Sequence, residues 1–191
     1  MKETPLTRAL ESERFVLDPV SRLTAFAISY PWTKDPELIG DFTCSSAPRT
    51  RRKWYREMTR PNNRTKFCHA IYPKGESKPI GMHMTVLRGH RSADTSVAIH
   101  DRAWWGKGVV AEVRARIIDH FFEYGPVDRF CGAVNARNLP SVFNYHKLGY
   151  RHVGTLHRSK SDPVTGDVFD MVVFELFRED WDQGRMVPGD G

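Results

Sequence analysis

Two glycines placed directly before an amphipathic helix constrain this chain more than any other feature. They lie in the segment at residues 104–110, which reads Trp-Trp-Gly-Lys-Gly-Val-Val. Apolar residues then recur at helical spacing, with charged residues opposite them: Val109, Val110, Val113, Ile117, Ile118, Phe121 and Phe122. A glycine loop that opens a helix exposes backbone N–H groups at the positive end of the helix dipole. The pattern therefore predicts a phosphate-binding site.

A second segment, about thirty residues later, carries polar groups suited to proton transfer. Residues 138–150 read Asn-Leu-Pro-Ser-Val-Phe-Asn-Tyr-His-Lys-Leu-Gly-Tyr, and Gly149 is placed to end a helix. This helix presents an amide, two hydroxyls and a lysine. Together, the two segments predict an enzyme that binds a pyrophosphate and performs acid–base chemistry beside it.

The remaining patterns predict a single α+β domain over residues 8–182, with a frayed tail over 183–191. Hydrophobic periodicity predicts strands at 14–18, 64–73, 80–86, 95–100, 129–135, 150–158 and 168–177. It predicts helices at 21–30, 49–59, 109–124 and 139–147, with Ser21 as the first N-cap. One β-α-β crossover lies in the middle and a hairpin closes the chain. The sheet is therefore expected to be mixed, mostly antiparallel and flanked by helices.

Composition narrows the class of protein. No apolar run approaches the roughly 20 residues that span a bilayer, and the N-terminal residues lack a signal-peptide pattern, so no membrane association is expected. Three well-separated cysteines, Cys44, Cys68 and Cys131, favour reduced thiols and a cytoplasmic location. Neither the cysteines nor the eight histidines have metal-ligand spacing, so no metal is expected.

The formal charge of +6 favours anionic partners, and the densest basic run lies at residues 49–56. One interpretation is a patch for nucleic acid or an acidic substrate. The other is the solvated face of a helix with Trp54 and Tyr55 turned inward. We favour the second because a single short run is weak evidence, and we do not expect a nucleic-acid partner.

At its two motif segments the chain resembles the GNAT superfamily of acyl-CoA-dependent N-acyltransferases. The loop is similar to the family's phosphate-binding pattern, Arg/Gln-x-x-Gly-x-Gly/Ala, although Trp105 replaces its basic or amide residue and Val110 its last small residue. The second segment matches the family pattern at Asn138, Ser141, Tyr145, Lys147, Gly149 and Tyr150. The similarity covers about residues 8–182 and is greatest to the branch that includes the ribosomal-protein-alanine N-acetyltransferases.

The resemblance implies a GNAT fold, in which two parallel strands splay apart, here those at 95–100 and 129–135. It implies acetyl-CoA as cosubstrate, with the pantetheine arm lying between these strands. The residues implied to bind it are Ile99, His100, Trp105, Gly106, Lys107, Gly108, Val109, Val110, Asn138 and Tyr145. Asn138 would hydrogen-bond the arm or the amide beside the thioester.

Acyl transfer needs a proton for the departing thiolate, and Tyr145 stands where the family's general acid usually stands. A phenol has an ordinary pKa of about 10 and can donate to a thiolate as the C–S bond breaks. The alternative is a half-buried tyrosine that only packs. Ser141 is the second candidate acid, and its alternative is a hydroxyl bonded to the helix backbone.

The general base stays open at this point. Candidates are His100 and Asp94, near the two ends of one strand, and Asp170, in the last strand. The apolar neighbours of Asp170 on its strand face predict a raised pKa, although the carboxylate could equally hold a neighbouring strand or loop. His83 is expected to face solvent or the acceptor cleft. A chain of bound water is a further candidate.

These patterns predict an N-acyltransferase that moves an acetyl group from acetyl-CoA to a primary amine, either a protein N-terminus or a small molecule. Direct transfer is expected because no cysteine lies at the motifs. One alternative is an NAD(P)-binding oxidoreductase that uses Gly106-x-Gly108-x-x-Ala111 with Asp128, although that fold needs several parallel β-α-β units. The other is a non-catalytic module that binds acyl-CoA or nucleic acid. The acceptor, the acyl length and the oligomeric state, a homodimer included, stay open.

Overall fold

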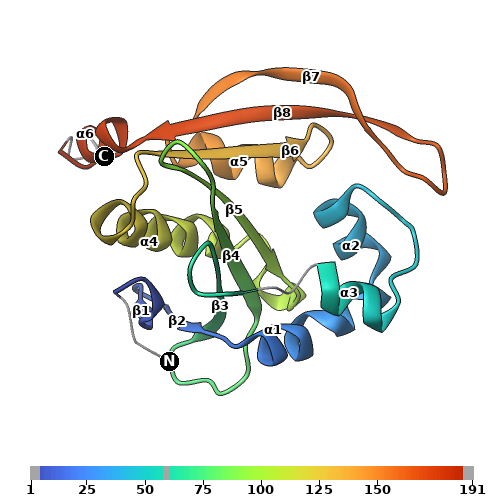
Figure 1. The fold of residues 1–191 in the computed structure, drawn as a ribbon, viewed down its shortest axis with the longest axis horizontal. Helices are drawn as coiled ribbons and strands as arrows, with labels where there is room; N and C mark the ends of the chain where they lie inside the picture. Colours follow the sequence, from blue (N-terminus) through green and yellow to red (C-terminus); the bar gives the residue numbers. More distant parts are fainter. Residues whose placement is uncertain (1–4, 58–60, 187–191) are drawn as a thin grey trace.

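The computed structural model describes residues 5–57 and 61–186, which form one mixed sheet with helices on both faces (Figure 1). The strands are β1 Leu10–Glu11, β2 Phe15–Pro19, β3 Lys66–Pro73, β4 Gly81–Leu87, β5 Ser92–Ile99, β6 Arg129–Asn135, β7 Arg151–Ser161 and β8 Val168–Phe177. The helices are α1 Arg22–Ser29, α2 Pro36–Thr43, α3 Arg51–Glu57, α4 Val109–Tyr124, α5 Leu139–Lys147 and α6 Arg178–Met186, with 3-10 turns η1 Pro5–Thr7, η2 Tyr30–Lys34 and η3 Arg102–Trp104. The predicted strands, helices and closing hairpin are confirmed, apart from small shifts at their ends.

The strand order is β1-β2-β3-β4-β5-β6-β8-β7, and β5 and β6 are the parallel pair among the described strands. These two strands pair only over Ser92↔Arg129, Ala93↔Phe130 and Asp94↔Cys131. Beyond Asp94 they separate, although β5 continues along β4 and β6 continues along β8. The mixed sheet with splayed parallel strands confirms the expected fold class.

Two hydrophobic clusters cover the two faces of the sheet. One joins α4 and α5 to side chains such as Phe67 and Ile71, and the other joins α1, α2 and α3 to Cys68 and Ala70. Both faces of β3 are therefore buried, as expected for a strand covered on both sides. The same covering buries His83 completely, so the expectation that it faces solvent or a cleft is wrong.

Local signals explain how the helices begin. Ser21 caps α1 by accepting a hydrogen bond from the Thr24 amide at 3.1 Å, as predicted. Asp35 caps α2 in the same way, followed by Pro36 at the first helical position. This cap-and-proline signal was present in the sequence, but the helix was not predicted.

The basic run at 49–56 lies around α3, where Trp54 is 1 % exposed and its indole N–H donates to the Ser29 hydroxyl at 2.9 Å. The preferred interpretation, a solvated helix face with Trp54 turned inward, is confirmed for this residue.

At the C-terminal end, α6 continues to Met186. The predicted frayed tail, which was to begin at residue 183, is therefore helical over its first four residues. Residues 187–191 lie outside the described part of the chain. Within that part, no helix is both long and apolar enough to cross a membrane.

Candidate active site

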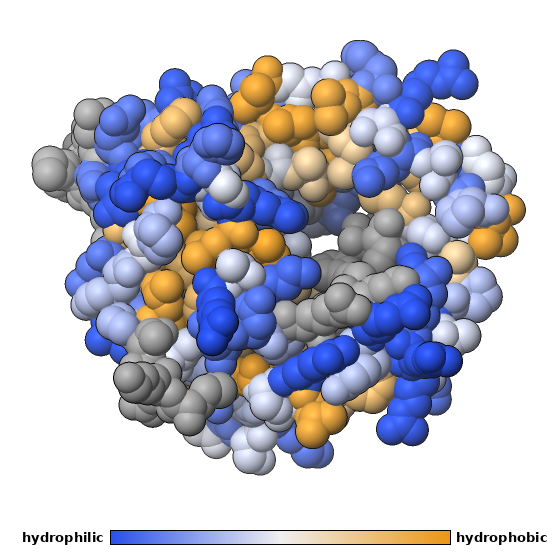
Figure 2. All heavy atoms as spheres, in the orientation of Figure 1, coloured by the Kyte–Doolittle hydropathy of each residue, from blue (hydrophilic) through white to orange (hydrophobic). Residues whose placement is uncertain are grey.

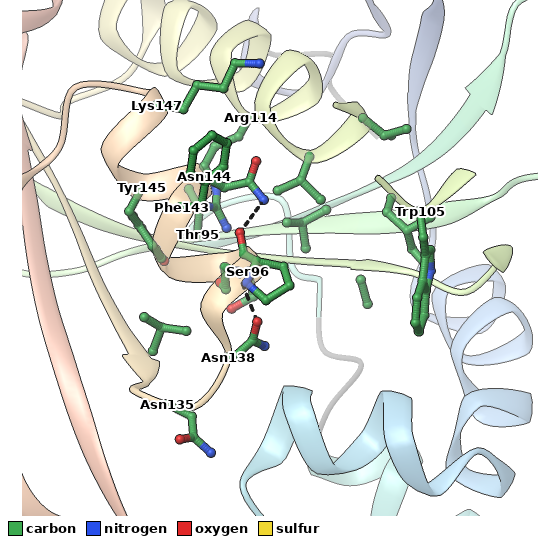
Figure 3. Close-up of a pocket in the computed structure, with 18 of the residues that line it drawn as sticks. Thr95, Ser96, Trp105, Arg114, Asn135, Asn138, Phe143, Asn144, Tyr145 and Lys147 are labelled. Atoms are coloured by element: carbon green, nitrogen blue, oxygen red, sulfur yellow. Dashed lines mark hydrogen bonds between the residues drawn. The ribbon is translucent and has the colours of Figure 1, made fainter. Parts of the chain in front are cut away.

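The splay between β5 and β6 opens into a cavity of about 920 Å³. Its walls are residues 95–99 of β5, residues 104–110 of the glycine loop, residues 133–135 of β6 and one side of α5. Leu38 and Cys44 of the α2 region close it from the other face of the sheet. Figure 2 shows the molecule hollowed beside this splay, and Figure 3 shows the side chains that line the cavity. The two motif segments of the sequence therefore meet around one space.

The glycine loop has the backbone that an anion site needs. Gly106 and Gly108 have φ values of +72° and +74°, in the left-handed region where side chains other than glycine are strained. Gly108 is the N-cap of α4 and has no side chain that could satisfy the first amides of the helix. Those N–H groups are therefore left for a ligand at the positive end of a 16-residue helix.

Arg14 holds this loop in place from the start of β2, a contact that the sequence did not predict. Its Nη2 donates to the Lys107 carbonyl at 2.9 Å, and its Nε donates to Glu112 in the first turn of α4 at 2.7 Å. Partial burial acts to raise the pKa of Glu112, but hydrogen bonds from the Arg14 amide and the Ser12 hydroxyl lower it overall. Glu112 is thus held as the anion that anchors Arg14.

Trp105 fixes the loop to the strand. Its indole N–H donates to the Ile99 carbonyl at the end of β5 at 2.9 Å, and Arg102 lies over its ring. Trp105 replaces the basic or amide residue of the family pattern, and here it lines the cavity. The expected cofactor residue Lys107 is exposed on the same loop, while His100 lies outside the cavity lining.

Asn138 caps α5 and lines the cavity at the same time. Its Oδ1 accepts a hydrogen bond from the Ser141 amide at 3.0 Å, shown by a dashed line in Figure 3. This bond orients the side-chain amide, so Nδ2 is the group that can donate to a carbonyl in the cavity. The Ser141 hydroxyl lines the same wall one turn further along the helix.

Tyr145 is locked in the wall of the cavity. It is 3 % exposed, and its ring stacks on Phe174 with centroids 4.8 Å apart and planes 5° apart. A Cβ at Gly132 of β6 would lie 2.5 Å from the Tyr145 hydroxyl oxygen, so glycine there makes room for the phenol. Gly132 was missed in the sequence analysis because a lone glycine within a strand does not show which ring will cross it.

The three candidate residues for the general base, His100, Asp94 and Asp170, do not line the cavity. The Asp170 carboxylate accepts hydrogen bonds from the Arg158 amide at 2.7 Å and from His157 at 3.0 Å. These two bonds lower its pKa, so the expected rise is wrong and Asp170 fits the structural alternative. Asp94 is paired with Arg88 at 2.6 Å. His100 stacks on Trp32, and burial lowers its pKa against the opposing charge of Asp101.

The charged side chains among the described residues that line the cavity are all positive. Among the described residues that line it there are three cations, Lys107, Arg114 and Lys147, and no carboxylate or imidazole. Lys107 and Lys147 are exposed, whereas Arg114 is 3 % exposed. Arg114 was not predicted to be functional, although a signal was present. It lies four residues after Val110 and three before Ile117, on the apolar stripe of α4.

Two histidines are buried side by side beneath α4, close to this cavity. His69 and His83 are opposite each other on β3 and β4 and are 1 % and 0 % exposed. Burial lowers the pKa of His69 to about 3, with a smaller contribution from His120. Burial also lowers the pKa of His83 well below its ordinary value, and the charges of Arg114 and His69 add to this. Both rings are therefore neutral in the folded protein at pH 7.

We expect these two histidines to make the fold sensitive to acid. Their pKa values are depressed in the folded state, so the unfolded chain binds more protons once the pH falls below about 6.5. Stability should therefore fall as the pH decreases through that value. At pH 5 each ring contributes a loss of about 2 kcal/mol. Urea unfolding at pH 7 and pH 5 measures the loss in the free energy of unfolding. In His83→Gln this loss should be smaller by about 2 kcal/mol, the contribution of one imidazole.

The control is His90→Asn, which removes an exposed imidazole and should leave the pH dependence unchanged. An unchanged pH dependence in His83→Gln would contradict this assignment.

Comparison with known proteins agrees with the site. The model of the acetyltransferase (GNAT) domain matches residues 14–151. No sequence among the curated proteins matches this chain. Solved structures share the fold. RimL, a ribosomal L7/L12 alpha-N-protein acetyltransferase in complex with coenzyme A, is 12 % identical with a TM-score of 0.74 over 88 % of this chain and 97 % of its own.

Two further structures are similar. A ribosomal-protein-S5-alanine acetyltransferase from Vibrio fischeri is 18 % identical, with a TM-score of 0.70 over 91 % of this chain and 98 % of its own. A GNAT-family acetyltransferase from Bacillus anthracis is 15 % identical, with a TM-score of 0.72 over 90 % of this chain and 99 % of its own. At these identities the structures support the fold, and the domain match covers most of the chain. The chain therefore belongs to the GNAT family of acetyltransferases.

Proposed function

We propose that this protein transfers an acetyl group from acetyl-CoA to a primary amine, and that the cavity between β5 and β6 is where transfer occurs. The observation that carries this proposal is the meeting of a helix N-terminus without a side-chain cap and a buried tyrosine around one cavity, whose described lining residues include no acid. The loop amides of 106–110 bind the pyrophosphate, and Lys107 adds positive charge. The unpaired backbone edges of β5 and β6 are available to the pantetheine arm.

The residues at the α5 end of the cavity support the chemical step. Asn138 Nδ2 donates to a carbonyl oxygen of the substrate and holds the thioester in place. The neutral amine attacks the thioester carbon, so a C–N bond forms as the C–S bond breaks. Tyr145 donates its proton to the departing thiolate and recovers one from solvent. The proton lost by the amine passes to water, since the described lining residues include no carboxylate or imidazole.

We propose direct transfer rather than an acyl-enzyme, even though Cys44 lies in the wall of the cavity. A nucleophilic cysteine must be a thiolate, which a neighbouring histidine or a helix N-terminus stabilises. Cys44 is instead the C-cap of α2, at the negative end of a helix dipole. Its position therefore disfavours the charged form that covalent catalysis requires.

The structure gives the oxidoreductase alternative no support. A dinucleotide fold repeats parallel β-α-β units, whereas the described sheet has one parallel pair. Asp128, the acid of that fingerprint, is bonded by both Nε and Nη2 of Arg91 and does not line the cavity. Leu38 and Cys44, the described lining residues at the acceptor end, carry no charge, which suits an amine on a protein N-terminus or a small molecule. On the odd number and wide separation of the three cysteines we place the reaction in the cytoplasm.

Acetyl-CoA is expected to raise the melting temperature of the protein, while NAD and NADP leave it unchanged. A ligand that binds only the folded state stabilises it by about 2.7 kcal/mol at one hundred times its Kd. For a chain of this size the shift is roughly 5–10 °C. Thermal melts with each nucleotide at matched concentrations measure it. A shift with NADP and none with acetyl-CoA would overturn the proposed function.

A further inference from the structure

Arg114 is a buried cation that lines the cavity, and two of its guanidinium nitrogens have no hydrogen-bond partner. The side chain is 3 % exposed, and neither Nε nor Nη1 has a hydrogen-bond partner. Its guanidinium lies over the ring of Tyr145, 4.5 Å from the centroid, and Figure 3 shows both residues at the same end of the cavity. Removing a charge from water is costly unless an anion or hydrogen-bond acceptors replace the water. The described residues do not supply them, so a ligand is the natural source.

Two further hydroxyl donors are buried close to Arg114. They are the hydroxyls of Thr95, on β5, and Tyr150, just before β7, and both are buried. Tyr150 does not itself line the cavity, but its ring centroid is 5.0 Å from that of Tyr145, the ring over which Arg114 lies. Burial raises the pKa of the Tyr150 phenol, so its hydroxyl keeps its proton. His83 also lies near Arg114, and burial lowers its pKa well below the ordinary value, so it adds no acid to the site. A guanidinium fork with two hydroxyl donors and no competing acid is the arrangement that binds a carboxylate.

The position of Arg114 separates it from the phosphate site. It lies six residues into α4 from Gly108, roughly 9 Å along the helix axis from the loop amides. It contacts Tyr145, where the thioester reacts, rather than the exposed Lys107 and Lys147 at the surface. The anion that meets Arg114 is therefore at the reacting end of the substrate.

The faces of the sheet indicate which substrate carries that anion. Arg114 and Thr95 lie on the face covered by α4, the helix that begins at the phosphate site. Leu38 and Cys44, which close the other side of the cavity, belong to the α2 face and carry no charge. The α4 face is the donor side of the site and the α2 face the acceptor side.

We propose that Arg114 and Thr95, with the Tyr150 hydroxyl buried behind them, form an acyl subsite for a carboxylate at the far end of the acyl group, as in a dicarboxylic acyl-CoA. This proposal rests on the proposed function, because it places the thioester beside Tyr145. Acetyl-CoA fills the subsite only in part, whereas a malonyl or succinyl group extends the acyl chain toward the guanidinium.

Calorimetric titration of the full chain with acetyl-CoA, butyryl-CoA and freshly prepared succinyl-CoA tests this without an acceptor. Succinyl-CoA and butyryl-CoA match in carbon number and differ in the terminal carboxylate. We expect succinyl-CoA to bind at least tenfold more tightly than butyryl-CoA. In Arg114→Met, which keeps an unbranched apolar chain, the ratio of the two Kd values should fall to about one. Thr95→Val should reduce the ratio in part while leaving Arg114 in place.

Each outcome decides a separate point. Equal affinity for succinyl-CoA and butyryl-CoA in the unmodified protein overturns the acyl subsite, even if Arg114→Met does not fold. Absence of binding by all three thioesters overturns the proposed function instead. To test the acceptor as the source of the carboxylate, turnover with acetyl-CoA is compared for an amino-acid acceptor and its amide. A preference for the free acid that is lost in Arg114→Met would assign the carboxylate to the acceptor and overturn the acyl assignment.

Discussion

Replacing Tyr145 with Phe is expected to lower kcat by roughly 10²–10⁴, while the Kd for acetyl-CoA stays within a few-fold. The ring packs face to face on Phe174 and over Gly132, and Phe keeps these contacts. Only the hydroxyl is lost, and with it the proton for the departing thiolate. A loss of kcat at constant Kd is the signature of an interaction made in the transition state. Turnover is followed by release of free CoA, after an acceptor screen, and Kd by calorimetry.

Ser141→Ala is the matched comparison, because Ser141 lies on the same wall of the cavity, one turn before Tyr145. Near-normal turnover in Tyr145→Phe together with an inactive Ser141→Ala would make Ser141 or a water the acid. Normal turnover in both variants, with chemistry shown to be rate-limiting, would remove both hydroxyls from the mechanism.

Gly108→Glu is expected to abolish detectable acetyl-CoA binding and the melting shift that it causes. Gly108 is the N-cap of α4 at the predicted pyrophosphate site. A Cβ added there would have one neighbour within 4 Å, the Nη2 atom of Arg14 at 3.9 Å. The new carboxylate would accept hydrogen bonds from the first amides of α4 and so compete with the phosphates for the same donors. It would also repel them. Calorimetry and thermal melts with acetyl-CoA measure the loss.

The positive φ of Gly108 complicates this variant, because any L-residue there is strained. Gly108→Asn is the control, since asparagine tolerates left-handed backbone and adds no charge. We expect Gly108→Asn to retain more acetyl-CoA affinity than Gly108→Glu at a similar melting temperature. Equal and undiminished affinity in both variants would place the pyrophosphate elsewhere.

The sequence was informative where function depends on local backbone geometry. A glycine before a helix, an N-cap residue and a helical stripe act over a few neighbouring residues, so Gly106, Gly108 and Ser21 could be assigned from the local sequence. The resemblance of the two motif segments to one family then predicted that β5 and β6 separate. That family is shown by the domain match.

The sequence was uninformative where burial and distant partners decide what a side chain does. Asp170 was expected to have a raised pKa from its apolar strand neighbours, but the Arg158 amide and His157 lower it. His83 alternates with apolar residues as an exposed residue would, yet α4 covers its face of the sheet. A period-two pattern predicts which residues share a face of the sheet. Whether that face is exposed to solvent depends on which helices pack against it.

The sequence therefore determined local features of this protein: the glycine loop that opens α4, the helix that carries Asn138 and Tyr145, and the single β-α-β crossover of the described sheet. Tertiary structure alone decided that Gly132 makes room for the Tyr145 phenol and that Arg14 holds the glycine loop from 93 residues away. It also decided that Arg114 faces a cavity rather than a core. Hydrogen bonds and burial couple residues far apart in the chain, and their strength depends on distances that no spacing in the sequence encodes.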